Sequence, residues 1–413
     1  MGWAIRESTA DDVPALVRAL WSAFGNQQPT DAQLDGAREF LEVDRTFVAI
    51  DGDRVVGSGG AITLELTVPG PAPVPTAGVT FVGVVPTHRR QGILTAVMAR
   101  VADDARRRGE PLAALLASES TIYRRFGYGV AVSAGMVEIE RAYARMRQPV
   151  DIAGRMRLLD RKETADVLPA VYDRYRRQQP GEVSRTAGWW ARRLADADNI
   201  RGGESGRFVA ACAEPGGSVG GYVTYRVQND WEGGIPGHTL IVEDLVATTP
   251  DVGAALWQYC FGVDLIKLVR ASNVALDDPL PWMLVDPRRL RVTAVNDFLW
   301  IRVLDVEAAL AARTYGSDGS LVLEVADGSG SDPGVAGRYR LDGGGGRPAG
   351  CRRTDEPPDL AIDAADLASA YLGGVRFTTL ARAGLVGELV PGAVARADSL
   401  FASSPGPASS TPF

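Results

Sequence analysis

One strand-to-helix junction constrains the fold of this chain more than any other feature. Residues 78–85 (GVTFVGVV) are almost entirely apolar, which is typical of a strand in the middle of a sheet with both faces covered. After a short turn, residues 92–108 carry apolar side chains at helical spacing, among them Ile93, Val97 and Val101. A buried strand that leads into an amphipathic helix predicts a sheet flanked by helices.

The order of elements recurs along the chain. Residues 9–17 (TADDVPALV) are similar to residues 164–172 (TADVLPAVY). Three predicted strands and a helix follow each of these segments. In the second copy they lie at residues 208–212, 220–226 and 238–246 and from residue 252 onward. This self-similarity predicts two related units.

A third segment begins near residue 299. Its predicted elements are a strand at 300–304, a helix at 306–313, an alternating strand at 320–325, a hairpin loop at the glycine run 343–346 and a helix at 363–372. Residues 403–413 (SSPGPASSTPF) lack apolar periodicity, and their composition predicts a disordered tail. With about 100–200 residues in a typical domain, the 413-residue length agrees with three domains.

Composition excludes several classes of protein. The net charge of -7 argues against a nucleic-acid binder and weakly favours cationic small molecules. Three widely spaced cysteines and two histidines suggest neither a disulfide framework nor a metal site. No apolar run approaches the roughly 18 residues of a membrane span, and no secretory signal precedes the first strand. We therefore expect a cytoplasmic protein without a metal, although export by an unconventional route stays open.

The turn between the buried strand and the helix is a candidate anion-binding site. It holds Arg89, Arg90, Gln91 and Gly92. Helix N-termini present free N–H groups and partial positive charge, and glycine lets a phosphate approach the backbone. These residues are therefore a candidate pyrophosphate cradle. An ordinary turn with solvated arginines is the commoner explanation of such a motif, so its context must decide.

That context resembles a known superfamily. Residues 117–129 (ASESTIYRRFGYG) follow a short apolar strand, and residues 89–94 (RRQGIL) resemble the cofactor signature of the Gcn5-related N-acetyltransferases (GNAT), with Leu94 departing at the last position. The chain further resembles the enhanced intracellular survival (Eis) family. Weaker similarity to that family continues at DDPLPWML (277–284), LWIRVLDVEAALAARTY (299–315) and SAYLGGVRFTTLARAGLV (369–386).

The resemblance implies an α+β protein of three domains. Two tandem GNAT-like units, each a mixed sheet flanked by helices, would span residues 1–151 and 152–298, and a sterol carrier protein-like unit would span 299–413. It also implies acetyl transfer from acetyl-CoA to primary amines of cationic acceptors, such as aminoglycosides or lysine-like amines, in a homohexamer.

The second unit is expected to lack a cofactor site. Its segment 246–257 (VATTPDVGAALW), which aligns with the candidate cradle, keeps no arginine, and Asp251 adds negative charge there. A carboxylate at this place would repel a pyrophosphate. The sequence therefore predicts one acetyl-CoA site for each chain, in the first unit.

The residues predicted to bind acetyl-CoA come from three places along the first unit. The free backbone N–H groups of a splayed strand around Gly83 would polarise the acyl carbonyl, and those of residues 90–95 would hold the pyrophosphate. The full predicted set is Val82, Gly83, Val84, Arg90, Gln91, Gly92, Ile93, Leu94, Thr95, Ser118 and Glu119.

Two catalytic residues follow from the resemblance. It implies that Tyr123, in the IYRRFGYG motif, protonates the coenzyme A sulfur, whereas without the motif a tyrosine packed in the core would be the simpler reading. It also implies that the terminal carboxylate of Phe413 is the base, which would require an ordered tail. Here Pro412 precedes Phe413 where the family often has an acidic residue. His88 stays open as an alternative base.

Two further classes of function stay open at this point. The third segment would allow a lipid carrier, and the cofactor motif would allow an acetyl-CoA-binding regulator with little turnover.

Overall fold

The computed structural model describes residues 2–70, 72–195, 204–330, 332–344 and 349–413. It divides into two compact units. Unit 1 comprises residues 1–132, 297–407 and 412–413, and unit 2 comprises residues 133–296 and 408–411.

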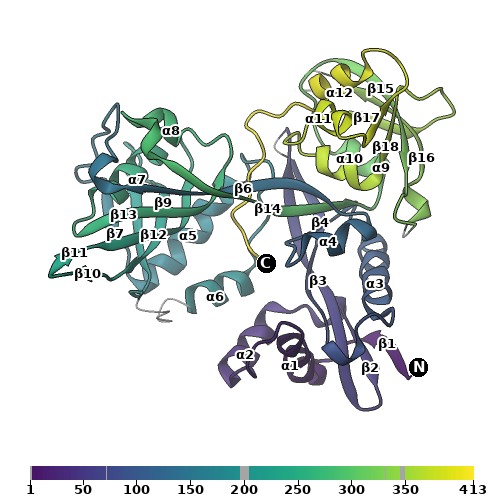
Figure 1. The fold of residues 1–413 in the computed structure, drawn as a ribbon, viewed down its shortest axis with the longest axis horizontal. Helices are drawn as coiled ribbons and strands as arrows, with labels where there is room; N and C mark the ends of the chain where they lie inside the picture. Colours follow the sequence, from purple (N-terminus) through teal and green to yellow (C-terminus); the bar gives the residue numbers. More distant parts are fainter. Residues whose placement is uncertain (1, 71, 196–203, 331, 345–348) are drawn as a thin grey trace. The chain divides into compact units, whose positions relative to one another are not determined.

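The first part of unit 1 is a twisted sheet with helices on it (Figure 1). The strands lie in the order β1-β2-β3-β4-β5-β14, and β4 and β5 are parallel neighbours. The strands are β1 (Trp3–Glu7), β2 (Thr46–Asp51), β3 (Arg54–Val68), β4 (Ala72–Val84), β5 (Leu112–Leu115) and β14 (Arg291–Val303). The helices are α1 (Val13–Ala23), α2 (Asp31–Phe40), α3 (Ile93–Arg107) and α4 (Ser120–Tyr123).

Helix α3 covers the sheet with the face that its sequence predicts. Ile93, Val97 and Val101 are buried in one cluster with Val79 of β4 and Ala113 of β5. Apolar side chains at positions i, i+4 and i+8 lie on one side of a helix, so this stripe fixes the rotation of α3 over the central strands. The predicted strand-to-helix junction is confirmed.

The hairpin between β3 and β4 is longer than its sequence suggests. The four prolines of residues 69–75 (PGPAPVP) favour a proline-rich hairpin or loop. Residue 71 lies outside the described residues, and β4 begins at Ala72 and pairs with β3 from there. Proline lacks a backbone N–H and is tolerated where no neighbouring strand needs that donor. Pro73 and Pro75 satisfy this condition, because β5 begins to pair with β4 only at Thr76.

The second part of unit 1 is a separate five-stranded sheet in the order β17-β16-β15-β18-β19. Its strands are β15 (Gly319–Ala326), β16 (Gly337–Gly343), β17 (Gly350–Arg353), β18 (Leu360–Asp363) and β19 (Val386–Glu388). Its helices are α9 (Val306–Ala311), α10 (Ala364–Ala370), α11 (Phe377–Arg382) and α12 (Ala393–Phe401). The predicted helix at 363–372 is confirmed as α10, whereas residues 345 and 346 of the predicted glycine hairpin lie outside the described residues.

Unit 2 repeats the topology of the first sheet. Its strands lie in the order β7-β8-β9-β12-β13-β6, and β12 and β13 are the parallel pair. They are β6 (Gly129–Glu140), β7 (Met156–Leu158), β8 (Phe208–Ala213), β9 (Val219–Gln228), β12 (His238–Ala247) and β13 (Ile266–Ala275), beside a small hairpin of β10 (Trp231–Glu232) and β11 (Ile235–Pro236). The helices are α5 (Arg161–Arg176), α6 (Ala187–Ala195), α7 (Pro250–Gly262) and α8 (Leu280–Met283). The predicted internal repeat is therefore present in the fold.

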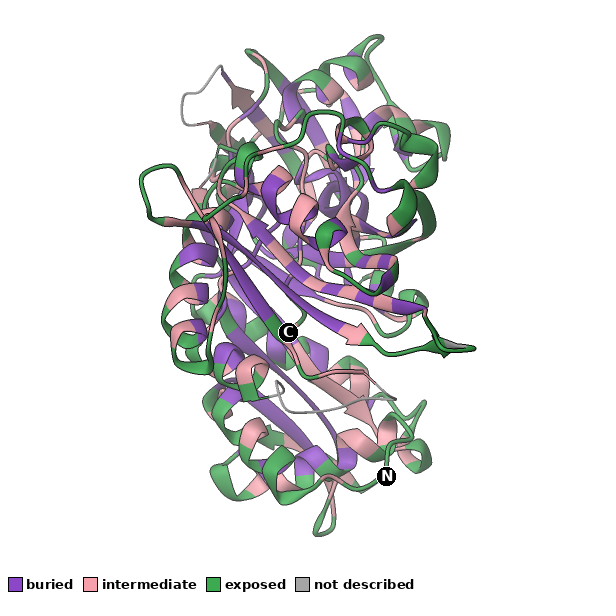
Figure 2. Ribbon diagram, turned by 90° about the vertical axis from the view of Figure 1, so that its left-hand side faces the viewer, coloured by how far each residue is buried: buried purple, intermediate pink, exposed green. Residues whose placement is uncertain are grey.

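The C-terminal tail contradicts the prediction from its composition. Ser409 and Thr411 are buried, with 2% and 1% of their surface exposed. Their segment gains order from hydrogen bonds of its hydroxyl groups with buried polar residues rather than from apolar periodicity, so the composition could not show it. In the described residues, buried positions otherwise concentrate along the strands (Figure 2). The described helices include none with the length and apolar character needed to cross a membrane.

Candidate active site

The two parallel strands of unit 1 part at one end and open a cleft. β4 and β5 pair from Thr76 with Leu112 to Gly78 with Ala114 and no further. Beyond this point Phe81 has a left-handed backbone (φ 54°), and the Ser58 hydroxyl donates a hydrogen bond to its carbonyl at 2.8 Å. The register between β3 and β4 shifts here. A bulge of this kind redirects a strand, so residues 82–84 have no ladder with β5.

The start of α3 has no side-chain cap. Its N-cap residue is Gly92, with φ 86°, and Arg90 also has a left-handed backbone with φ 61°. The first N–H groups of a helix have no acceptor inside the helix. The N–H groups of Ile93, Leu94 and Thr95 are thus available at the positive end of a four-turn helix, as an anion site requires.

A cavity of about 670 Å³ joins the open strands to this helix start. Its lining contains Tyr123 and every predicted acetyl-CoA-binding residue except Gln91, whose amide donates a hydrogen bond to the Thr87 carbonyl at 3.3 Å. Sequence reasoning missed Ala23 and Phe24 at the end of α1, and Ile122 and Arg125 beside Tyr123. No local motif marks the α1 residues, because they reach the cavity through the packing of α1 against the sheet.

The three basic residues of the turn have different partners. Both ring nitrogens of His88 are engaged, Nε2 with the Asp51 carboxylate at 3.1 Å and Nδ1 with the Thr87 hydroxyl at 2.8 Å. Arg89 donates to the Ala23 carbonyl at 2.7 Å and so fastens the turn to α1. Arg90 is exposed and has no hydrogen-bond or ion-pair partner among the described residues. Of the three basic residues of the turn, Arg90 is therefore the one that its described surroundings leave free to meet an anion.

Tyr123 lies at the end of α4 and lines the same cavity. The residue is 6% exposed, and no described residue forms a hydrogen bond with its hydroxyl. Burial, and then the negative charge of Glu119, raise the pKa of Tyr123 above that of a free phenol. The phenol therefore stays protonated at neutral pH and can donate a proton into the cavity.

Tyr128 provides a contrast in the same loop. Its ring packs edge-on against Tyr123 at 6.1 Å between centroids, and burial raises its pKa as well. It is 2% exposed and does not line the cavity. Position in the loop, rather than chemistry, thus separates a tyrosine that faces the cavity from one that packs in the core.

The third segment of the chain holds the Tyr123 loop in place. Arg124 donates two hydrogen bonds, both 2.8 Å, to the carboxylate of Asp366 on α10. Helix α10 also packs directly on Gly129, where a Cβ atom would lie 1.9 Å from the Ala365 carbonyl oxygen. The end of α4 is therefore fixed on both sides of the motif that contains Tyr123.

The remaining predicted catalytic residue, Phe413, is not among the residues that line this cavity. Pro412 and Phe413 group with unit 1, whereas residues 408–411 group with unit 2.

The corresponding helix start in unit 2 is closed by the chain itself. The Thr249 hydroxyl accepts a hydrogen bond from the N–H of Val252 at 3.3 Å, and Pro250 occupies the first helical position. Asp251 forms an ion pair with Arg155 at 2.6 Å. The Thr249 hydroxyl thus caps one N–H group at the start of α7, Pro250 has no N–H group, and Asp251 adds negative charge, whereas α3 leaves its first N–H groups free.

Comparison with known proteins finds a family model for each of three regions of the chain. Residues 4–131 and 181–303 each match the model of an acetyltransferase (GNAT) domain, and residues 306–409 match that of a sterol carrier protein domain. The chain is 37% identical over 414 residues to N-acetyltransferase Eis of Mycobacterium tuberculosis, with 96% of each protein covered. The chain belongs to the Eis family of N-acetyltransferases. The resemblance seen in its motifs, the fold class and the enzyme class are thereby confirmed.

Other relatives place the whole chain in the same family. An uncharacterized N-acetyltransferase of Streptomyces avermitilis is 39% identical over 404 residues, which is 98% of each chain. The crystal structure of Eis1 from Mycobacterium abscessus matches with a TM-score of 0.88 at 36% identity, over 99% of this chain and 100% of that one. GNAT acetyltransferases use acetyl-CoA as the acetyl donor.

Proposed function

We propose that this enzyme binds acetyl-CoA in the cavity between β4 and α3 and acetylates primary amines of cationic acceptors, such as aminoglycosides or lysine-like amines. The observation that carries the proposal is the convergence on one cavity of the open start of α3, the buried Tyr123, and Arg90, which has no ion-pair partner among the described residues. The residues fit the donor, because Gly92 has no atom other than one of Trp3 within 4 Å of a Cβ position and leaves the helix start accessible.

Each part of the cavity has a role in this proposal. Acetyl-CoA supplies an activated acetyl thioester. The N–H groups of residues 82–84 stabilise negative charge on the acyl oxygen, and the start of α3 with Arg90 holds the pyrophosphate. The amine nitrogen attacks the carbonyl carbon, the carbon–sulfur bond breaks, and Tyr123 protonates the departing thiolate.

The reaction also needs a base that takes the proton from the amine. We assign it to the terminal carboxylate of Phe413. A free carboxylate of this kind has a pKa near 3.5, so it needs burial or a relaying water to act as a base. His88 is the weaker alternative, because both of its ring nitrogens are engaged in the turn.

Self-association as a homohexamer is a further part of the proposal. Residues 276–295 of unit 2 expose several large apolar side chains, and Trp282 is 80% exposed. The others are Leu276, Val285, Val292 and Val295. Large exposed apolar side chains within one stretch of chain make that stretch a candidate interface. Light scattering after size-exclusion chromatography tests this part, and a smaller assembly for Trp282→Ser than for the native chain is expected.

The lipid-carrier alternative has less support. The Arg313 guanidinium, 1% exposed, donates to the backbone carbonyls of Tyr371 and Phe401 within the third segment. Tyr371, Phe377 and Phe401 are themselves buried around it. These side chains occupy the interior where a lipid chain would have to lie. We retain the division at residues 1–151, 152–298 and 299–413 as the domain organisation that accompanies this function.

The deciding experiment measures release of the coenzyme A thiol from acetyl-CoA with a panel of aminoglycosides, polyamines and lysine peptides. We expect turnover with at least one cationic amine. Tyr123→Phe should lower kcat by about 10²–10⁴-fold and leave acetyl-CoA binding intact, while the matched Tyr128→Phe keeps its turnover. A chain extended by one residue after Phe413 tests the base. No turnover with any amine, despite tight acetyl-CoA binding, would favour the regulator.

A further inference from the structure

The second unit contains a splayed strand pair like that of the active site. β12 and β13 pair in parallel as far as Val242 with Ala271 and no further. The register between β12 and β9 shifts just beyond Val242, and Asn273 on β13 has a left-handed backbone with φ 57°. In unit 1 the equivalent divergence of β4 and β5 opens the proposed acetyl-CoA cavity.

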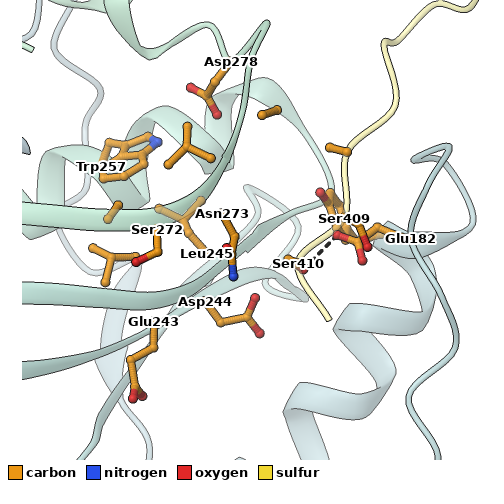
Figure 3. A pocket seen from close by; sticks show the side chains of 16 residues that line it. Glu182, Glu243, Asp244, Leu245, Trp257, Ser272, Asn273, Asp278, Ser409 and Ser410 are labelled. Atoms are coloured by element: carbon orange, nitrogen blue, oxygen red, sulfur yellow. Dashed lines mark hydrogen bonds between the residues drawn. The ribbon is translucent and has the colours of Figure 1, made fainter. Parts of the chain in front are cut away.

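The chain's own C-terminal segment lies in this second splay. Residues 408–410, together with residues 242–245 of β12 and 271–275 of β13, line a cavity of only about 80 Å³ (Figure 3). A cavity of this size holds a few water molecules. The space between the diverging strands is thus largely filled by peptide rather than left open for a cofactor.

Backbone contacts hold the segment closely. The Ala408 N–H donates to the Pro180 carbonyl at 2.9 Å. Gly181, the next residue in that loop, has φ 94°, and a Cβ atom there would lie 2.6 Å from the Ala408 carbonyl oxygen. The backbone of this loop therefore packs directly against the backbone of the tail.

Hydroxyl groups of the tail complete a buried polar network. The Thr411 hydroxyl lies 2.7 Å from the Tyr172 hydroxyl and accepts a hydrogen bond from Arg185 Nε at 3.0 Å. The Ser410 hydroxyl donates to Glu182 at 2.8 Å, as Figure 3 shows, and accepts from Arg185 Nη2 at 3.2 Å. One arginine thus donates hydrogen bonds to the hydroxyl groups of two successive tail residues.

Arg185 is held rigidly for this task. Its side chain is fully buried and forms an ion pair with Asp244 of β12 at 2.6 Å. Its guanidinium stacks on Tyr172 at 3.7 Å and on Trp189 at 4.3 Å from the ring centroids. A buried arginine is costly unless its donors are satisfied. Asp244 and Tyr222 take part of the donors, and Ser410 and Thr411 take the rest.

We propose that the splay between β12 and β13 is a docking site for residues 408–411, that Arg185 is its recognition residue, and that docking positions Pro412 and Phe413. The second unit has exchanged a cofactor site for a peptide site in the same part of its fold. Only the catalytic consequence rests on the proposed function. The docking itself does not depend on which residue is the base.

The test uses hydrogen–deuterium exchange of residues 408–411 in the full-length chain, alongside acetyl-CoA binding and turnover. Thr411→Val removes the hydroxyl without leaving a charge unpaired, and Thr411→Ser is its matched control. We expect about tenfold or more faster exchange for Thr411→Val and near-native exchange for Thr411→Ser, since only the valine variant loses a buried hydrogen bond to a charged group. The acetyl-CoA dissociation constant should stay within about twofold of native for both variants.

Arg185→Met provides the stronger perturbation, with Arg382→Met at an exposed site as its control. Faster exchange of the tail in Arg185→Met, together with a lower kcat, supports both docking and positioning. Unchanged exchange in Thr411→Val and in a folded Arg185→Met overturns the docking site. Faster exchange with unchanged kcat leaves docking intact and overturns the positioning of Phe413, and with it the role of Phe413 as base.

Discussion

The ion pair between Arg124 and Asp366 should respond unequally to the loss of either partner. Asp366 is 2% exposed, whereas the Arg124 side chain is 49% exposed. Replacing Arg124 by Met strands a buried carboxylate, and breaking a buried pair in this way costs about 3–5 kcal/mol. Asp366 lies in the first turn of α10, where its interaction with the helix dipole offsets about 0.3–1 kcal/mol of that cost. We therefore expect Arg124→Met to lower the free energy of unfolding by about 2–4 kcal/mol.

The converse change should cost less. In Asp366→Asn the guanidinium of Arg124 can turn to water, so the loss is that of charge-assisted hydrogen bonds alone, about 1–2 kcal/mol. Urea unfolding of both variants and of Arg382→Met, an exposed arginine on the same segment, measures the difference. Equal costs, or a larger cost for Asp366→Asn, would refute the argument from burial. Both variants should also lower kcat more than they raise the KM for acetyl-CoA, because Tyr123 immediately precedes Arg124.

Three further predictions concern single groups. Burial raises the pKa of Asp278 in the folded state. The protonated carboxyl group therefore stabilises the fold fully below the unfolded-state pKa, and this contribution is lost as the pH rises through the folded-state pKa. Asp278→Asn should therefore raise the melting temperature, and by more at pH 8 than at pH 4. The pKa of Tyr123 is raised above about 10, so Tyr123 should stay protonated up to pH 9. In the native enzyme, kcat should therefore not fall below pH 9 through deprotonation of Tyr123, and the kcat–pH profiles of native enzyme and Tyr123→Phe should have the same shape up to that pH. The Ser409 hydroxyl is buried and has no hydrogen-bond partner among the described residues, so in thermal unfolding Ser409→Ala should be neutral or stabilising by up to about 1 kcal/mol. A clear loss of stability in this variant would contradict the argument.

The sequence predicts the elements whose signal is local. The helix at α3 and the strand that precedes it follow from apolar spacing alone, and they carry most of the proposed acetyl-CoA site. The strand predicted at 300–304 is only the last part of a longer strand, β14. β14 begins at Arg291, and its first residues are largely exposed. They carry no apolar pattern to reveal them, and beside β6 they find pairing partners that only the fold supplies.

The site itself was predictable only in part, for a physical reason. Glycine, arginine and tyrosine at fixed spacing mark the turn and the Tyr123 loop. Phe24 lines the cavity and Asp366 binds Arg124. No sequence motif identifies either residue, because both reach the site through the packing of their helices. The tail is the extreme case, because Thr411 meets partners more than two hundred positions earlier in the chain. Its polar composition indicates disorder until those partners are known.

The placement of Thr411 has a consequence for how unit 2 reaches its full stability. Tyr172 and Arg185 lie more than two hundred positions before Thr411 in the chain, yet the polar network around Arg185 is complete only with Ser410 and Thr411 in place. Without those two residues, Arg185 would be a buried arginine with unmet donors, which is costly. The loop that must close to complete this network is long, and the entropic cost of closing a loop rises only slowly with its length. A segment remote in sequence can therefore supply hydrogen bonds that the second repeat lacks by itself.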